Sequence, residues 1–230
     1  MLKSNDLINK VKSYNKFLNP ETLDKAYNFA VKAHENQKRQ SGDPYVIHPV
    51  AVANILTELK LDSATIATGL LHDTIEDTHA TYQTIKQEFG QEVADLVEGV
   101  TKISELENQA KANSRAENFR KLIIATSKDI RVLLVKIADR LHNMRTIHSI
   151  DKQEKKERIA RETMEIYSPL ADRMGMNRIR DELEDLSFEV LNPKARKLIK
   201  DRLDKIKENN LIGFNSVADE FTKLLNENDL

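Results

Sequence analysis

The sequence predicts an all-α protein, and three observations support this class. Of the 230 residues, 40% are hydrophobic, which is enough apolar material for a sizeable core. Apolar residues recur with the helical period, whereas the alternation typical of strands is nearly missing. Only 6 glycines and 5 prolines interrupt the chain. We expect about ten helices, over residues 21–37, 47–59, 63–76, 81–89, 91–99, 115–127, 129–148, 154–175, 177–190, 193–208 and 215–226.

Residues that favour turns or helix caps separate these predicted helices. Proline fixes φ and lacks a backbone donor, glycine tolerates unusual backbone angles, and aspartate or asparagine caps helix N-termini. The boundaries of this kind are Asn19-Pro20, the segment 41–44, Leu61 to Ser63, Phe89-Gly90 and Asn192-Pro193. The stretch from Ser104 to Ser114 (SELENQAKANS) is polar and weakly periodic, which predicts a mobile loop beside the candidate functional site that is described below.

The composition excludes several classes of protein. Lys plus Arg number 36 against 37 Asp plus Glu, so the chain lacks the basic excess of a dedicated nucleic-acid binder, although a local phosphate site remains possible. Cysteine is absent, so any metal must be held by histidine and carboxylate. Without a signal peptide or an apolar run of about 18 residues, the chain is expected to be a soluble cytoplasmic protein.

The segment "GLLHDTIEDT", residues 69–78, places polar groups behind apolar ones at the end of a predicted helix. On one continuous helix, His72, Asp73, Glu76 and Asp77 would share a broad face. Three carboxylates near a helix C-terminus repel one another and oppose the helix dipole, so a bound divalent metal would stabilise them. The alternative is a solvated helix end with His72 on the surface.

A second histidine lies in "SGDPYVIHPV", residues 41–50. His48 follows an apolar trio and precedes Pro49 in the first turn of the next predicted helix. It is a candidate metal ligand, and the alternative is a helix-capping or core histidine.

A buried carboxylate is expected in "VLLVKIADRLHNMRT", residues 132–146. Asp139 interrupts the apolar side of this helix, and an unpaired buried aspartate is costly. Pairing with Arg140 or Arg145 is the structural alternative to metal binding. The tripeptide Ala-Asp-Arg that contains Asp139 occurs again around Asp172. Asp139 is preferred as the metal ligand because its flanks are more apolar and because Asn143 and Thr146 add polar groups on the same side.

Two histidines and two aspartates in this order resemble the HD superfamily of metal-dependent phosphohydrolases. Five blocks narrow the resemblance to the hydrolase domain of the RelA/SpoT family, which degrades guanosine tetra- and pentaphosphate. These blocks are "SGDPYVIHP", "LLHDTIEDT", "VKIADRLHNMRT", "YSPLADRMGM" and "ELEDLSFEVLNP". The resemblance as a whole covers roughly residues 15–193. The resemblance implies an HD-type helical bundle over residues 1–193 and a C-terminal helical extension over 194–230.

The resemblance also implies roles for individual residues. Four side chains would ligate a single Mn²⁺: His48, His72, Asp73 and Asp139. Glu76 and Asp77 would position and activate the attacking water. The nucleotide pocket would be lined by Arg39, Ser41, Asn143 and Thr146. The implied reaction removes the 3′-pyrophosphate of ppGpp or pppGpp, gives GDP or GTP, and controls the stringent response.

The chemistry of these residues agrees with such roles and leaves alternatives open. Four nitrogen and oxygen ligands leave about two octahedral positions for water and a phosphate oxygen. A carboxylate nearby can accept the proton of the attacking water, although Asp77 could instead orient a ligating histidine. Arg39 could be an ordinary surface charge. The other histidines, His34, His79, His142 and His148, are expected at surface or packing positions without an assigned role.

The chain departs from the family pattern at two positions and in one region. Gln40 stands where members often carry a basic residue, and Asp172 stands where a histidine is common. No segment resembles the synthetase domain of the long members, so we expect either a stand-alone hydrolase or an N-terminal portion of a longer bifunctional protein. The rival functions are a phosphohydrolase of another nucleotide and a catalytically silent nucleotide-binding module.

Overall fold

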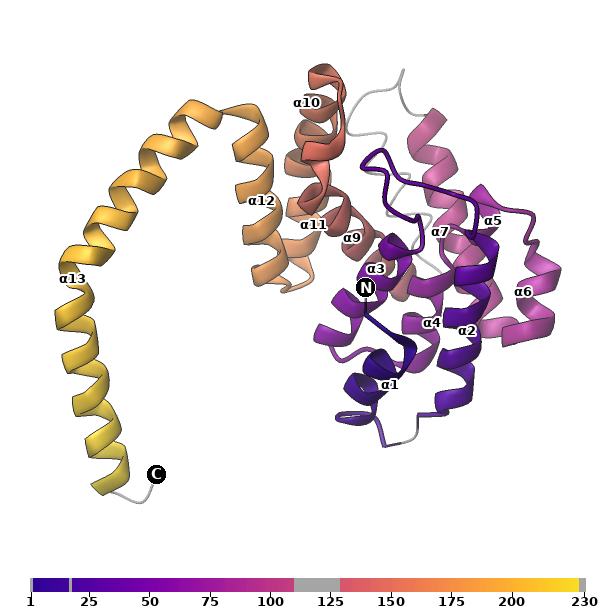
Figure 1. Cartoon of the computed structure of the whole chain (residues 1–230), viewed down its shortest axis with the longest axis horizontal. Coiled ribbons are helices and arrows are strands. Elements are labelled where there is room, and N and C mark those ends of the chain that lie inside the picture. Colours follow the sequence, from indigo (N-terminus) through magenta and orange to yellow (C-terminus); the bar gives the residue numbers. More distant parts are fainter. Residues whose placement is uncertain (1, 17, 110–128, 228–230) are drawn as a thin grey trace.

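The computed structural model describes residues 2–16, 18–109 and 129–227, and over these residues the chain is helical without a β-strand. Figure 1 shows the arrangement of the helices. The helices are α1 (Ser4–Lys12), α2 (Pro20–Ala33), α3 (Ile47–Glu58), α4 (Ser63–Leu71), α5 (Thr74–Asp77), α6 (Tyr82–Phe89), α7 (Gln91–Gln109), α9 (Ile130–Arg145), the 3₁₀ turn η2 (Ile147–Ser149), α10 (Gln153–Glu162), the π-helical η3 (Thr163–Tyr167), α11 (Ser168–Arg173), α12 (Asn177–Leu191) and α13 (Pro193–Glu227). The predicted all-α class is confirmed.

Helices α3, α4 and α9 form the centre of the core. Helix α4 contacts α2, α3, α7 and α9, and every residue of it from Thr65 to Leu71 is buried. Gly69 permits the close approach of α3, since a Cβ at this position would lie 2.6 Å from Leu56 Cδ1. A helix that is apolar on all sides belongs inside a protein, which agrees with the central position of α4.

Side-chain caps begin several helices where the sequence predicts a boundary. Asn19 accepts a hydrogen bond from the backbone of Glu21, and Asp62 accepts one from that of Thr65. Gly90 takes a φ of 89°, which glycine adopts without strain, between α6 and α7. The helix boundaries predicted at these three positions are confirmed.

The prediction of one helix over 63–76 is wrong, because the helix is interrupted at His72 and Asp73. Helix α4 ends at Leu71 and the short helix α5 begins at Thr74. Side-chain donors, in place of backbone N–H groups, bind the last carbonyl groups of α4. His72 Nδ1 donates to the Gly69 carbonyl, and the Thr74 hydroxyl donates to that of Leu71. The histidine and the three carboxylates therefore do not share one face of a continuous helix.

Other predicted spans also differ. Helix α1 was not predicted, and residues 104–109 are helical instead of belonging to a loop. The rest of that loop, 110–114, and the predicted helix 115–127 lie outside the described residues. The predicted helix 154–175 is divided into α10, the π-helical η3 and α11.

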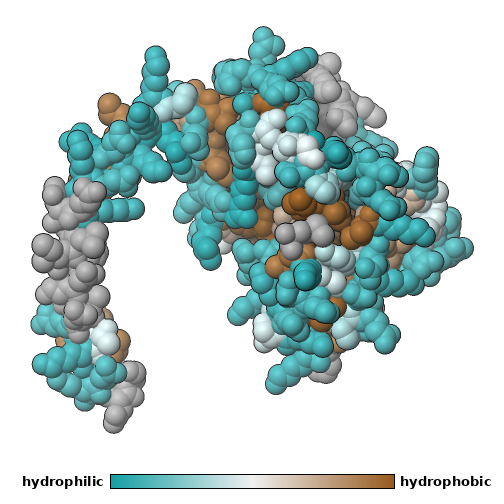
Figure 2. Space-filling view, viewed as in Figure 1, coloured by the Kyte–Doolittle hydropathy of each residue, from teal (hydrophilic) through white to brown (hydrophobic). Residues whose placement is uncertain are grey.

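Helix α13 is a single helix where two were predicted. It runs away from the other helices (Figure 1). Its exposed apolar side chains, some visible as brown patches in Figure 2, are Leu198, Ile199, Leu203, Ile206, Val217, Phe221, Leu224 and Leu225. Among the described residues, none of the helices combines the length and the apolar character that crossing a membrane requires.

Candidate metal centre

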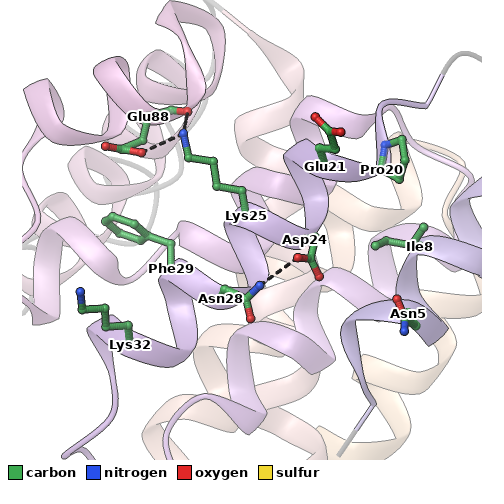
Figure 3. A pocket seen from close by; sticks show the side chains of 10 residues that line it. All are labelled: Asn5, Ile8, Pro20, Glu21, Asp24, Lys25, Asn28, Phe29, Lys32 and Glu88. Atoms are coloured by element: carbon green, nitrogen blue, oxygen red, sulfur yellow. Dashed lines mark hydrogen bonds and ion pairs between the residues drawn. The ribbon is translucent and has the colours of Figure 1, made fainter.

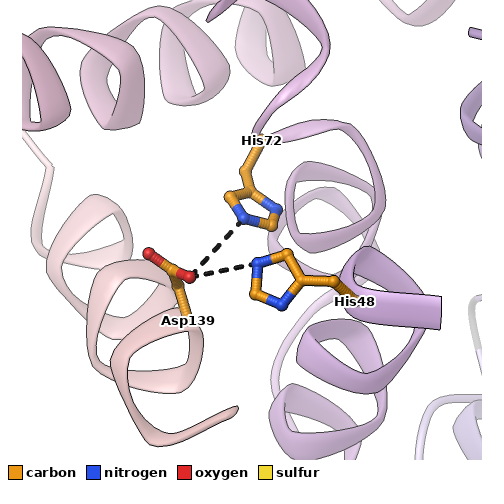
Figure 4. Close-up of side chains that lie close together, drawn as sticks. All are labelled: His48, His72 and Asp139. Carbon is orange, nitrogen blue, oxygen red and sulfur yellow. Dashed lines mark ion pairs between the residues drawn. The ribbon is translucent and has the colours of Figure 1, made fainter. Parts of the chain in front are cut away.

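Three side chains from separate parts of the sequence converge in the core, as Figure 4 shows. His48 lies in the first turn of α3, His72 directly follows α4, and Asp139 lies on α9. His48 Nε2 is 3.1 Å from Asp139 Oδ1, and His72 Nε2 is 3.9 Å from the same oxygen. One ligand atom from each residue lies within 4.8 Å of the other two, so the three could hold one ion. All three are buried.

Asp73 borders this group, and its two oxygens face different imidazoles. Oδ1 is 3.1 Å from His72 Nε2, and Oδ2 is 3.5 Å from His48 Nε2. The Tyr45 hydroxyl donates to Asp73 Oδ2 over 2.8 Å and lies 2.9 Å from Asp77 Oδ2. A phenol carries one hydrogen, so it serves one of these carboxylates at a time.

The histidine rings are oriented for coordination through Nε2. His72 Nδ1 lies 2.9 Å from the Gly69 carbonyl oxygen, to which it donates. Its Nε2 is buried and makes no hydrogen bond of acceptable geometry, although carboxylate oxygens lie nearby. Buried polar atoms are normally satisfied. An imidazole nitrogen of this kind beside carboxylates is a donor set suited to a first-row divalent ion.

The charges in the site depend on one another. Burial lowers the pKa of His72, but the negative charges of Asp73 and Asp139 outweigh burial and raise it to about 9. Burial dominates at His48 and lowers its pKa. Burial opposes ionisation of Asp139, yet Lys136 and His48 hold its pKa well below the usual range. The site therefore favours positive charge beside its carboxylates, which a divalent ion would supply.

Asp139 is held by residues of its own helix. Lys136 Nζ donates to Oδ2 over 3.1 Å, and Asn143 Nδ2 donates to Oδ1 over 2.6 Å. The arginines considered as partners are engaged elsewhere. Arg140 lies 3.3 Å from Glu162 and stacks over the Tyr167 ring, while Arg145 makes two hydrogen bonds to Glu182. Lys136, which the sequence reasoning did not single out, is therefore a partner of Asp139.

The competing Asp172 is placed differently. It is exposed on α11 and pairs with Arg180 of α12. It takes no part in the group formed by His48, His72 and Asp139.

A cavity of about 220 Å³ opens beside the metal centre, at His48 and Asp139. Its lining is Tyr45, His48, Asp73, Glu76, Asp77, Ser104, Asp139 and Asn143. Glu76 and Asp77 are its solvent-exposed carboxylates. Partial burial raises the pKa of Glu76, the hydrogen bond from Ser104 counteracts it, and the charge of Asp73 adds to the rise. Glu76 is therefore a better proton acceptor than an ordinary exposed glutamate.

A second cavity, of about 290 Å³, adjoins the first and shares Asp139 and Asn143 with it. Its other lining residues are Arg39, Gln40, Lys136, Arg140, Thr146, Ser149, Ile150, Lys155 and Ile159. Three of the four predicted nucleotide-binding residues thus line one cavity. Ser41 does not line it; its hydroxyl donates to Asp43 over 2.8 Å in the loop before α3.

His142 occupies a packing position, one of the two that we expected, and contacts a candidate metal ligand there. It is buried, and its Nδ1 lies 2.7 Å from His48 Nδ1 and 3.2 Å from Arg39 Nη1. The sequence carried one signal for it, because His142 stands three residues after Asp139 and so on the same side of α9. Tyr45 was also missed, although it lies in a quoted block.

A larger cavity, of about 700 Å³, lies between α1, α2 and the end of α6 (Figure 3). Its polar groups are largely paired with one another: Lys25 with Glu88 over 2.8 Å and Asn28 with Asp24 over 3.0 Å. None of its lining residues is a histidine. It offers neither the donor set nor the unsatisfied nitrogen of the metal centre.

Known proteins are similar to this chain in sequence and in fold. The model of the HD domain family matches residues 26–177. A GTP pyrophosphokinase rsh of Brucella melitensis is 49% identical over 230 residues, which are 100% of this chain and 30% of that protein. The bifunctional (p)ppGpp synthase/hydrolase SpoT of Escherichia coli K12 is 56% identical over 179 residues, 78% of this chain and 25% of that protein. The chain thus spans less than a third of the length of these relatives.

A second Escherichia coli relative, from O157:H7, is a guanosine-3′,5′-bis(diphosphate) 3′-pyrophosphohydrolase with the same identity and coverage. A solved structure described as a metazoan ortholog of SpoT that hydrolyzes ppGpp is 24% identical, with a TM-score of 0.50, and covers 84% of this chain and 97% of its own. This likeness supports the fold.

Proposed function

The chain belongs to the HD domain family, and from this premise we propose that it hydrolyses guanosine 3′,5′-bis(diphosphate), ppGpp, and its pentaphosphate analogue in the stringent response. The products are GDP or GTP and pyrophosphate. The observation that carries the proposal is the buried group of His48, His72 and Asp139, with an unsatisfied imidazole nitrogen, beside a cavity lined by cationic side chains. The names of the Escherichia coli relatives supply the substrate.

The residues of the site fit a divalent metal, which we propose to be Mn²⁺. Nε2 of His48, Nε2 of His72 and a carboxylate oxygen of Asp139 would hold it, with Asp73 as the fourth ligand. Imidazole and carboxylate suit Mn²⁺ and neighbouring first-row ions, and no thiolate is present in the sequence to favour softer metals. When bound, such an ion lowers the pKa of water and neutralises charge developing on phosphorus.

The two cavities divide the substrate between them. The 3′-pyrophosphate enters the cavity lined by Asp73, Glu76 and Asp139. The nucleoside and its 5′-phosphates lie in the neighbouring cavity, where Arg39 and Lys155 supply positive charge. Asn143 and Thr146 line this second cavity, while Ser41 belongs to the loop beside Arg39.

Glu76 acts as the general base. A water molecule attacks the phosphorus attached to the ribose 3′ oxygen, Glu76 accepts its proton, and the bond from that phosphorus to the 3′ oxygen breaks. The leaving oxygen takes up a proton to become the 3′ hydroxyl. Asp77 shares the Tyr45 hydroxyl with Asp73, so its role is to orient this side of the site. A base with a raised pKa, held beside the reacting water, accelerates such a step.

Incubation with ppGpp, with and without Mn²⁺, followed by nucleotide separation, tests the proposal. We expect GDP and pyrophosphate to accumulate only with the metal. Parallel reactions with GTP, GDP and ATP test the alternative that another nucleotide is the substrate. If ppGpp stays intact under every metal tried, the proposed function is wrong; faster turnover of another nucleotide would replace the substrate and keep the chemistry.

The organisation of the chain is also a proposal. Residues 1–193 form the hydrolase domain, and residues 194–230, largely α13, form a helical extension. In the longer relatives, the corresponding segment would lead toward a synthetase and regulatory domains. The cytoplasmic location stays a prediction.

A further inference from the structure

His142 is a buried histidine that the proposed reaction does not use. It lies on α9, between the metal centre and the cavity that holds Arg39. Its Nδ1 is 2.7 Å from Nδ1 of His48 and 3.2 Å from Nη1 of Arg39. One nitrogen atom therefore meets a candidate metal ligand and a side chain of the neighbouring cavity.

The chemistry of the three groups fixes the direction of both hydrogen bonds. A guanidinium can only donate, so the nitrogen of His142 that meets Arg39 must accept. Since that nitrogen carries a lone pair, Nδ1 of His48 must carry the hydrogen. In a neutral His48 the lone pair is then on Nε2, the atom that faces Asp139 over 3.1 Å. This is the tautomer that metal binding requires.

We propose that His142 is a positioning residue, which holds His48 in its metal-binding tautomer and links that ligand to Arg39. The inference rests on the proposed metal centre. His72 obtains the same tautomer from the Gly69 carbonyl. The two hydrogen-bond acceptors differ in the number of donors that they can bind, because a carbonyl oxygen has two lone pairs and an imidazole nitrogen has one.

Because Nδ1 of His142 has a single lone pair, His48 and Arg39 compete for it. Arg39 also donates to Asn143 Oδ1 over 2.9 Å, and Asn143 donates to Asp139. Once Nε2 of His48 is coordinated, its Nδ1 keeps the hydrogen even when a phosphate group draws Arg39 away. The whole lone pair of His142 then becomes available to His48, whose imidazole becomes a stronger ligand. Anion binding and metal binding therefore favour each other, and the coupling is reciprocal.

The first test measures Mn²⁺ affinity alone, from the electron paramagnetic resonance signal of the free ion, without nucleotide. Position 142 is changed to phenylalanine, which removes the acceptor, and to asparagine, whose side-chain oxygen lies where Nδ1 was. We expect His142→Phe to weaken Mn²⁺ binding about 10–100-fold and His142→Asn to stay within about threefold of wild type, since it keeps an acceptor. His79→Asn, at an exposed histidine, is the matched control and should not change the affinity.

The melting temperatures of the metal-free proteins separate positioning from folding. If His142→Phe binds Mn²⁺ as tightly as wild type, the inference is overturned. It is also overturned if His142→Asn folds normally and binds as weakly as His142→Phe.

The second test examines the competition and does not need His142→Phe to fold. Arg39→Met is combined with wild-type His142 and with His142→Asn, whose oxygen can accept from both donors. Loss of the arginine charge raises Mn²⁺ affinity in both backgrounds, but release of the lone pair adds to this only with His142. A larger gain with His142 supports the inference, and an equal gain in both backgrounds overturns the competition.

These tests are separate from the reaction. A wild-type protein that bound Mn²⁺ as described and left ppGpp intact would overturn the proposed substrate while the role of His142 stood. A wild-type protein that bound no Mn²⁺ would overturn both.

Discussion

Two cavities of similar size meet at Asp139 and Asn143, yet their charges are opposite. The cavity of about 220 Å³ is lined by the imidazole of His48 and by four carboxylates, which lie in the sequence within the blocks around His72 and Asp139. The cavity of about 290 Å³ is lined by Arg39, Lys136, Arg140 and Lys155. The lining of the first cavity favours a cation, which would in turn attract the 3′-pyrophosphate, and that of the second favours the 5′-phosphates of the proposed substrate. One helix, α9, serves both cavities: Asp139 belongs to the candidate metal centre, while Lys136 and Arg140 line the cationic cavity.

Removal of a carboxylate from the first cavity should have the largest effect on metal binding and turnover. Asp73→Ala takes away an oxygen from beside each imidazole, so we expect Mn²⁺ binding and turnover to fall by orders of magnitude. Circular dichroism checks that the variant folds. Near-wild-type turnover in a folded Asp73→Ala protein would show that the acidic cavity is not the reaction site.

Glu76→Gln separates proton transfer from metal binding in the same cavity. The amide keeps the size of the side chain and cannot accept the proton, so kcat should fall about 10²–10⁴-fold. Because Glu76 is not among the proposed ligands, Mn²⁺ affinity should change little. Equal losses of metal affinity and kcat would instead make Glu76 a ligand.

Tyr45→Phe tests the hydroxyl shared by two carboxylates. A hydrogen bond to a charged group contributes about 1.5–3 kcal/mol, so its loss should lower kcat about 10–100-fold if it acts in the transition state. A variant in which only the melting temperature changes would assign Tyr45 a purely structural role.

The smallest expected effect lies in the cationic cavity. Lys155 is exposed on α10 and lines it, whereas its neighbour Lys156 is not among the lining residues. An exposed charge pair contributes about 0.2–1 kcal/mol, so Lys155→Ala should raise KM for ppGpp by up to about fivefold with kcat unchanged. Lys156→Ala is the matched control. If both variants raise KM equally, the effect is one of general charge, and the cavity does not hold the phosphates.

Much of the fold could be predicted from the sequence, because long amphipathic or apolar segments have few alternatives to a helix. The break after Leu71 could not, since it depends on hydrogen bonds from His72 and Thr74 to carbonyl groups of the preceding turn. Local propensity does not report such bonds. The prediction also ended a helix at residue 208 and began another at 215, whereas α13 continues through the segment NNLIGF, residues 209–214.

The residues of the candidate site divide in the same way. Apolar flanks distinguished Asp139 from Asp172, because burial of a carboxylate among apolar neighbours requires compensation that an exposed one does not. His142 was not assigned because its role depends on partners distant in sequence, Arg39 and His48. Lys136 was missed although its partner Asp139 lies only three residues away on the same helix. Spacing along one helix places these side chains on a face and does not identify what that face meets.

The central claim is that His48, His72 and Asp139 hold one divalent ion beside a cationic cavity. A crystal structure with bound Mn²⁺, with the ion located by its anomalous scattering, tests this claim most directly. We predict a single strong anomalous peak, from an ion bonded to Nε2 of both histidines and to the carboxylate of Asp139. An ion bound elsewhere, with these three side chains left uncoordinated, would contradict it.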